Sequence, residues 1–395
     1  MPVSVVNLRT GKAKNHEWNG GASVLAEMGS SQLEYYYLSS KIQDSTLYDK
    51  ARKVLTLLDS LKKPKKGLYP VYVQTNKEIL SFSSNRLAIG SLADSFYEYL
   101  LKLYLLSGRE DQDALRMYLE SIDGITENLV RVEWHQGREY AFVGELQGDR
   151  FINRQEHLSC FFGGLLALGS SVFGPTTDPE TLSEPEYKLW SSSAKHLKLA
   201  KQLVEGCYLS YQMTSTGLGP EEFEFTLEPE DGEDLIRVIK PGYLLRPETI
   251  ESLFILYRVT GETVYREQAY TIFQVQIFAD SLFLFFTYYV CLSKTCGLET
   301  MIFPFLFFFS LSLSLSLSLS LSLSLSLLLS LSLSLFLSLS FTLSLSLFIS
   351  LSLSFFLSLS FFSFRMNFRF VRLIAFFSFF FRTGNQRTLP HEECL

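Results

Sequence analysis

An abrupt change of composition after Gln274 limits what this chain can fold into more than any other feature. From the next residue onward charged residues nearly vanish and Phe and Leu dominate, and across residues 310–360 Ser and Leu alternate almost without interruption. Strict alternation is a strand pattern, but strands in globular proteins are only a few residues long. We therefore expect an ordinary globular domain in residues 1–274 and a low-complexity Phe/Ser-Leu tail in residues 275–395.

The tail has two further explanations. A membrane segment is a poor fit because every second residue is a hydroxyl, although the uncharged run is long enough to cross a bilayer. A CT dinucleotide repeat, read in any frame, alternates TCT and CTC codons, which encode Ser and Leu. Every Val codon begins with GT, as most introns do, and Val275 opens the tail. We interpret residues 275–395 as translated intron, with a genuine tail as the alternative. Sequencing the transcript across these codons tests this.

The charge of the chain argues against a nucleic-acid partner. The formal net charge is −6 and arises from the first part of the sequence, where basic residues form no cluster. The residues after Met1 contain neither the charged start nor the apolar core of a signal peptide, so we expect no targeting segment in the printed chain. An acidic protein that binds a neutral polyhydroxylated ligand or a cation fits this composition.

Three stretches of the first part share one pattern of two consecutive amphipathic helices. They occupy residues 31–51, 96–125 and 252–270, and in each the apolar residues recur at intervals of three and four. Gly108 and Gly261 stand where a helix C-cap is expected. Each stretch therefore predicts a helical hairpin.

Short strand-like segments separate these helical hairpins. Residues 68–73 and 140–152 carry apolar and aromatic residues in strand patterns, the second with a Gly-Asp turn. The hairpins lie too far apart in the sequence for a tight helical solenoid. We therefore predict an all-α fold, an incomplete toroid of helical hairpins with short β-hairpin inserts.

Acidic residues stand at the beginning of the predicted helices. Asp94 and Glu98 are four residues apart, and Glu248 and Glu251 are three apart, so each pair shares a helix face. Glu27 lies near the start of the first hairpin. Paired acids on one face repel unless a cation or a hydrogen-bonding group lies between them.

These acids have an ordinary explanation and a functional one. Asp94 suits a helix N-cap, and Glu248, after Pro247 at the first helical position, suits the helix dipole. In a toroid, however, equivalent helix entrances converge on one cavity, and a glycosidase needs carboxylates there as acid and base. His157 also precedes an apolar helix, where a lone histidine is more often structural. The spacing leaves both explanations open.

Two of the five cysteines belong to the first part of the chain. Cys160 and Cys207 both lie in apolar helical contexts, and neither has a neighbouring cysteine at metal-binding spacing. Two buried thiols and a single disulfide bond both remain open on this evidence.

Three blocks of sequence resemble glycoside hydrolase family 47, the class I α-1,2-mannosidases. The blocks come in the family's order and cover residues 90–102, 157–169 and 244–254. The resemblance extends over roughly residues 2–274 and includes none of the tail. It implies an (α/α)7 barrel that removes terminal α-1,2-linked mannose from high-mannose N-glycans by an inverting mechanism. It also implies a Ca2+ ion that binds sugar hydroxyls, and a membrane-anchored protein of the endoplasmic reticulum or Golgi lumen.

The resemblance assigns roles to individual residues. By motif position Glu248 is the catalytic base, and Asp94 is a second carboxylate required for catalysis. Cys160 and Cys207 occupy the positions of the family disulfide. Five further residues would line the pocket of the −1 sugar: Glu27, Glu98, His157, Arg246 and Glu251.

The chain also departs from the family pattern. The helices with the glutamate taken as general acid would precede Pro2, and those with the Ca2+-ligating threonine would follow Gln274. We therefore expect no direct metal ligand in this chain, no N-terminal membrane anchor and no mannose release by the chain as printed. Leu92 replaces the arginine of endoplasmic-reticulum enzymes, which favours a Golgi-type glycan preference. The alternatives are a non-catalytic mannose-binding relative and a helical-repeat scaffold whose acids only cap helices.

Overall fold

The structure is a computed structural model that describes residues 2–75, 80–230, 232–277 and 279. All of these except Ala279 belong to one compact unit. The predictions for residues 280–395 lie outside the described residues, and the proposed domain boundary after Gln274 stays a prediction.

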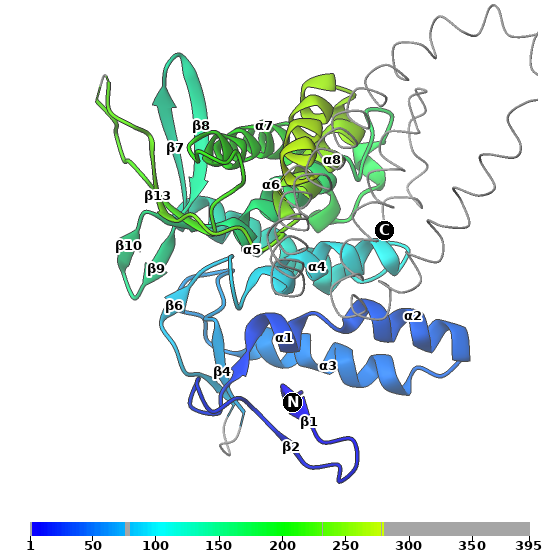
Figure 1. Ribbon diagram of the computed structural model, residues 1–395. Coiled ribbons are helices and arrows are strands. Elements are labelled where there is room, and N and C mark those ends of the chain that lie inside the picture. Colours follow the sequence, from blue (N-terminus) through cyan, green and yellow to red (C-terminus); the bar gives the residue numbers. More distant parts are fainter. Residues whose placement is uncertain (1, 76–79, 231, 278, 280–395) are drawn as a thin grey trace, which may run out of the picture. The chain divides into compact units, whose positions relative to one another are not determined.

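Helices dominate the described part of the chain (Figure 1). Residues 263–277 are also helical, although this segment has no element label. The predicted hairpins are present as the antiparallel neighbours α2 and α3, and α4 and α5, while α8 is followed by residues 263–277. The named helices are α1 (Leu25–Gly29), α2 (Gln32–Ile42), α3 (Thr46–Ser60), α4 (Asp94–Leu106), α5 (Gln112–Asn128), α6 (Phe161–Ser170), α7 (Glu184–Gln212) and α8 (Glu248–Thr260).

Short antiparallel strands connect the helices. One two-stranded sheet pairs β1 (Val5–Val6) with β2 (Ala13–Lys14), and another pairs β7 (Val130–His135) with β8 (Arg138–Val143). The first three-stranded sheet has the order β3 (Ser23–Val24), β4 (Tyr72–Gln74), β5 (Ser81–Phe82). The second has the order β10 (Arg150–Ile152), β9 (Glu145–Gln147), β6 (Arg86–Leu87). The third has the order β11 (Arg154–Glu156), β12 (Glu222–Phe225), β13 (Ile236–Lys240).

The predicted β inserts are confirmed, with one shift. Residues 140–152 form β8, β9 and β10, and the Gly148-Asp149 turn connects the last two. The earlier insert was predicted at residues 68–73, but its first strand, β4, begins only at Tyr72. This strand forms a hairpin with β5. Tyr69 of that stretch is buried instead against the rings of Phe96 and Tyr97. Core packing of the aromatic residue outweighs the strand pattern there.

Helix α6 lies at the centre of the part that carries the site. Its residues Phe161 to Gly169 are all buried, and it packs against both α7 and α8. Two glycines allow these close approaches, since a Cβ on Gly163 would meet Val204 of α7 and one on Gly164 would lie 2.9 Å from Ser252 of α8. The apolar run that predicted this helix therefore has neighbours on several faces.

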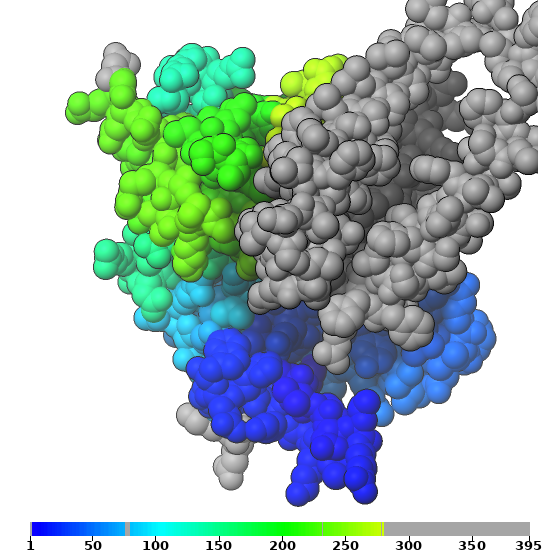
Figure 2. Space-filling view, viewed as in Figure 1, coloured from blue at the N-terminus to red at the C-terminus, as the bar shows by residue number. Residues whose placement is uncertain are grey.

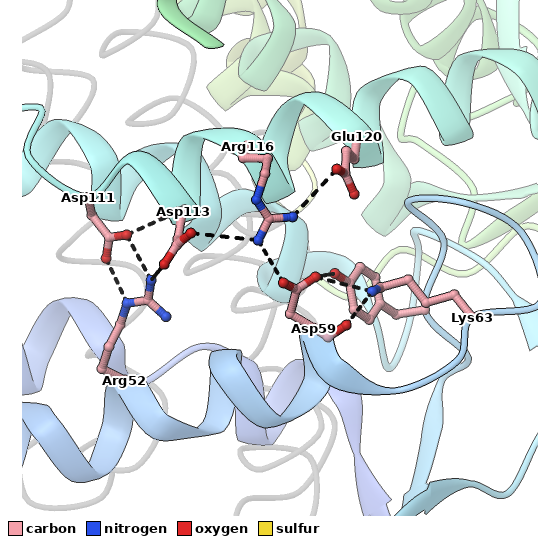
Figure 3. Close-up of polar contacts among 9 residues, drawn as sticks. Arg52, Asp59, Lys63, Asp111, Asp113, Arg116 and Glu120 are labelled. Carbon is pink, nitrogen blue, oxygen red and sulfur yellow. Dashed lines mark hydrogen bonds and ion pairs between the residues drawn. The ribbon is translucent and has the colours of Figure 1, made fainter. Parts of the chain in front are cut away.

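Ion pairs connect α3 to α5 (Figure 3). Arg52 of α3 makes two hydrogen bonds of 2.7 and 2.8 Å to Asp111, whose carboxylate also accepts a hydrogen bond from the Ala114 amide as the N-cap of α5. About two turns further along α3, Asp59 pairs with Arg116 of α5 at 2.6 Å. Bidentate, partly buried pairs of this kind fix the angle between two helices more firmly than exposed ones.

The N-terminal β1–β2 segment lies at the surface of the described part (Figure 2). Its apolar residues are open to solvent, and Leu8 at the turn is almost fully exposed. Helix α2 also keeps Tyr37, Leu38 and Ile42 exposed within the described residues and buries only Gln32 and Ser39.

Candidate active site

The two pairs of acids lie at the entrances of α4 and α8. Asp94 is the first residue of α4 and Glu248 the first of α8, while Glu98 and Glu251 follow one turn later. The N-cap positions are occupied by Ala93 and Pro247, and neither helix has a side-chain cap.

The expected N-cap role of Asp94 is therefore wrong. Among the described residues, its carboxylate accepts hydrogen bonds from the backbone N–H of Ser95, at 2.8 Å, and from the Ser95 hydroxyl, at 3.4 Å. An N-cap side chain would instead satisfy an amide two or three residues further along. Pro247, expected at the first helical position, is instead the N-cap residue, and Glu248 is the first residue of α8.

A leucine with left-handed backbone geometry precedes each entrance. Leu92 has φ +77° and Leu245 has φ +55°, a conformation that is costly for a residue with a branched side chain. The chain turns at these residues just before Asp94 and just before Arg246 and Glu248. Strained backbone of this kind is concentrated at functional sites, where the surrounding structure holds it in place.

The four carboxylates form one electrostatic cluster. Burial raises the pKa of Asp94 to about 6, and the negative charges of Glu248 and Glu98 add to the effect, while hydrogen bonds from Ser95 oppose it. Burial likewise raises the pKa of Glu251 to about 7, opposed by Lys102 and supported by Glu98 and Glu248. The charge effects connect Glu248 and Glu98 with both Asp94 and Glu251, so the four carboxylates lie within electrostatic reach of one another.

His157 lies beneath the entrance of α8. It belongs to the 3-10 helix η1 (His157–Cys160) and is 1% exposed, and its Nε2 shares a 2.7 Å hydrogen bond with the hydroxyl of Tyr211. Its Nδ1 lies 3.4 Å from Oε2 of Glu248. These two atoms are not aligned for a hydrogen bond, and within the described residues each is buried without another partner. The base candidate thus presents a buried oxygen whose hydrogen-bonding capacity is unused.

A disulfide bond and a serine fix the position of the segment that carries His157. Cys160 and Cys207 are bonded with their Cα atoms 6.0 Å apart, which connects η1 to α7. Ser252 of α8 donates a 2.5 Å hydrogen bond to the Cys160 carbonyl and accepts one of 2.8 Å from the Gly164 amide. The segment that carries His157 is therefore bonded covalently to α7 and, through Ser252, by hydrogen bonds to α8, which carries Glu248.

Arg246 reaches the same region through a partner that the sequence did not indicate. Its Nε donates a 2.6 Å hydrogen bond to Glu221, and its backbone carbonyl accepts one of 3.0 Å from the Tyr243 hydroxyl. Tyr243 also contacts the ring of His157. Tyr243 therefore connects the backbone of Arg246 to the ring of His157.

Glu27 is the expected site residue whose contacts point elsewhere. Its carboxylate accepts a 2.5 Å hydrogen bond from the Ser4 hydroxyl and lies 3.8 Å from Nε2 of His16. The adjacent Ala26 amide donates to the carbonyl of Leu92, so the start of α1 is attached to the loop before Asp94. The backbone of Glu27 is therefore near the entrance of α4, while its side chain contacts the N-terminal segment.

The structure adds residues that the sequence reasoning missed. Lys102 pairs with Glu98 and lies close to Glu251, and a Glu-to-Lys spacing of four on one helix was the signal that could have identified it. Glu156 accepts a 2.5 Å hydrogen bond from the Ser91 amide, and a Cβ on Gly90 would overlap its side chain. Glu221 and Tyr211 are brought in by long-range packing, for which the local sequence carries no signal.

The fold is that of a known group of α/α toroid proteins. An α-1,2-mannosidase from Trichoderma reesei superposes with a TM-score of 0.55 at 24% sequence identity, over 64% of this chain and 51% of that one. The predicted fold class, an incomplete toroid of helical hairpins with short strands, is confirmed by this likeness together with the described elements.

Sequence comparison places the chain more narrowly. The profile of glycosyl hydrolase family 47 matches residues 1–277, so the chain belongs to this family. A mannosyl-oligosaccharide 1,2-alpha-mannosidase of Candida albicans is 40% identical over 283 residues, which cover 69% of this chain and 48% of the relative. The endoplasmic reticulum mannosyl-oligosaccharide 1,2-alpha-mannosidase of Homo sapiens is 36% identical, over 69% of this chain and 36% of the relative. The chain spans about half or less of the length of these curated relatives.

Proposed function

We propose that residues 2–277 form the base-bearing half of a site that hydrolyses terminal α-1,2-linked mannose in high-mannose N-glycans, by inversion at the anomeric carbon. Family membership and the names of the relatives support a mannose-containing oligosaccharide as substrate. The observation that carries the proposal is the Glu248 carboxylate, held 3.4 Å from Nδ1 of the buried His157 and within electrostatic reach of Asp94 and Glu251.

Glu248 is the proposed catalytic base. An inverting glycosidase needs one carboxylate to take a proton from water as it attacks the anomeric carbon, while an acid protonates the leaving oxygen. The Glu248 side chain is 18% exposed, and with Oε2 turned toward His157 the other carboxylate oxygen can accept that proton from a water molecule. The rigid attachment of α8 to η1 through Ser252 holds the carboxylate in place for this step.

The remaining residues are proposed to bind the sugar. A mannose presents several hydroxyls, each of which donates and accepts hydrogen bonds, and Glu98, Glu251 and Arg246 supply charged partners for them. Asp94, with a pKa of about 6, is the proposed second carboxylate required for catalysis. Glu27 would join the pocket by releasing its contacts with Ser4 and His16.

The family resemblance implies a Ca2+ ion whose direct ligand, a threonine, is expected after Gln274. Across the described part of the chain, no three His, Cys, Asp or Glu residues are arranged to hold a metal ion. We therefore derive no step through Ca2+, and Ca2+ dependence remains a proposal for the whole protein.

The endoplasmic reticulum or Golgi lumen is the proposed compartment. The human and mouse relatives are named as endoplasmic reticulum enzymes, and the Cys160–Cys207 bond suits an oxidising lumen. Membrane anchoring is part of the same proposal. In the described residues, no helix combines the length and apolar character needed to cross a bilayer.

Calorimetric titration of the chain with α-1,2-mannobiose tests the proposal. We expect binding, at least tenfold weaker binding of α-1,6-mannobiose, and loss of affinity in His157→Ala, whereas Lys198→Ala on the distant surface of α7 binds as the wild type does. Equal binding of both disaccharides, or none, would contradict the proposal.

With a Man9 glycan, the chain as printed is expected to release no mannose. Sugar binding without release by a full-length protein would favour a mannose-binding role instead.

A further inference from the structure

Lys102 forms a bridge between two helices within the carboxylate cluster. It lies one turn after Glu98 on α4, and its ammonium donates a hydrogen bond to Oε1 of that residue. The same nitrogen lies 3.6 Å from Oε1 of Glu251 on α8. The side chains of Lys102 and Glu98 are only 23% and 20% exposed, so this is not a loose surface ion pair.

The ammonium of Lys102 lies where it offsets the repulsion between the neighbouring carboxylates. Glu98 and Glu248 both raise the pKa of Glu251 through their negative charge, and Lys102 opposes them. Burial by itself lowers the pKa of Lys102, but Glu98 and Glu251 outweigh it, so that pKa stands above its ordinary value and the side chain remains charged. A fixed positive charge therefore allows acids from two helices to lie close together in a partly buried site.

The geometry also restricts the orientation of both acids. A carboxylate that accepts a hydrogen bond at one oxygen keeps its second oxygen available in a defined direction. Glu98 accepts such a hydrogen bond from Lys102 at Oε1, and Oε1 of Glu251 lies 3.6 Å from the same nitrogen as an ion pair. Two carboxylates held beside one ammonium suit the vicinal hydroxyls of a sugar, since preorganised acceptors lose little entropy on binding.

We propose that Lys102 is a positioning residue of the sugar-binding site, which holds Glu98 and Glu251 together as oriented acceptors for the hydroxyls of a terminal mannose. This inference rests on the proposed function for its sugar ligand. Lys102 itself makes its contacts with the carboxylates and acts on the sugar through them.

Lys102→Met and Lys102→Arg separate charge from packing. Methionine keeps most of the length and removes the charge, and arginine keeps the charge. Lys63→Met is the matched control, because Lys63 is a comparably buried lysine that pairs with Asp59 four residues before it, away from the site. Circular dichroism establishes that each variant is folded before binding is compared.

Two measurements on the full chain then test the positioning role of Lys102. In α-1,2-mannobiose titrations, Lys102→Met is expected to weaken binding at least tenfold, while Lys102→Arg and Lys63→Met stay within about threefold of the wild type. By NMR of the glutamate side-chain carboxyl carbons, Lys102→Met is expected to raise the pKa of Glu251 by about one unit, and Lys63→Met to leave it unchanged.

The outcomes distinguish the inference from the proposed function. An unshifted Glu251 titration in Lys102→Met overturns the bridge, whatever happens to sugar binding. A shifted titration with unchanged sugar affinity overturns the positioning role. If the wild-type chain binds no mannobiose, the proposed function fails, and the positioning role fails with it, while the titration still decides whether Lys102 bridges the two acids.

Discussion

At the scale of single residues, the site is defined by acids that are partly removed from water. Asp94 and Glu251 have raised pKa values because burial and neighbouring carboxylates disfavour their ionised forms. His157 is placed against Glu248 by the hydroxyl of Tyr211, which fixes the orientation of the ring. Near neutral pH the raised pKa values of Asp94 and Glu251 each cost folding free energy, which is typical of groups retained for function.

The raised pKa values predict how stability depends on pH. Below the ordinary pKa of an acid, both folded and unfolded states carry the proton. Between the ordinary pKa and the raised one, the folded state binds more protons, so the free energy of unfolding falls as the pH rises. For Asp94 and Glu251 we expect this decline between about pH 4 and pH 7.

Asp94→Asn should reduce that slope and stabilise the protein at pH 8 by about 1 kcal/mol, because the amide carries no charge to bury. Urea denaturation at several pH values measures both quantities. The control is Asp149→Asn, whose side chain is 94% exposed and which should leave the slope unchanged. A variant at position 94 with the wild-type slope would show that this carboxylate is not coupled to the cluster.

At the scale of elements, the helical hairpins were predictable and their connections were not. Apolar periodicity and the C-cap glycines Gly108 and Gly261 located the helices, and both glycines have positive φ as expected. The acids at positions 94, 98, 248 and 251 were placed on helix entrances by spacing alone. By contrast, the Arg246–Glu221 pair joins two loop residues 25 positions apart, and nothing in the local sequence specifies such a contact.

The left-handed leucines were also beyond sequence reasoning. Leucine is an unfavourable residue at positive φ, so the local sequence around Leu92 and Leu245 predicts ordinary backbone. Tertiary contacts such as the hydrogen bond from Ala26 to the Leu92 carbonyl impose the conformation. The disulfide between Cys160 and Cys207 was implied by the family resemblance and not by the spacing of the cysteines.

The contact between α3 and α5 gives a prediction at this scale. Asp111→Ala removes both the N-cap of α5 and the bidentate partner of Arg52, and should lower the free energy of unfolding by about 2–4 kcal/mol. Asp113→Ala on the same helix is the control, since its side chain is 71% exposed and its loss should cost less than about 0.5 kcal/mol. Equal effects in urea denaturation would contradict the importance of the buried pair.

At the scale of the whole molecule, the described residues form part of a family 47 fold. The family match ends at residue 277, close to the change of composition after Gln274 that the sequence shows. The relatives are at least about twice as long as the stretch they share with this chain. The described part of the chain thus brings together Glu248, His157 and the carboxylate cluster, and the complete activity is a property proposed for the whole protein.

The central claim, that Glu248 is the base of an α-1,2-mannosidase site, is tested most directly in a chimera. Residues 1–277 replace the matching stretch of the Candida albicans relative, and mannose release from a Man9 glycan is measured for the chimera and its Glu248→Gln variant, with circular dichroism to show that both are folded. We expect the chimera to release mannose and the variant to be slower by about 10²- to 10⁴-fold, because glutamine cannot accept the proton of the attacking water. Unchanged turnover in the variant would contradict the claim.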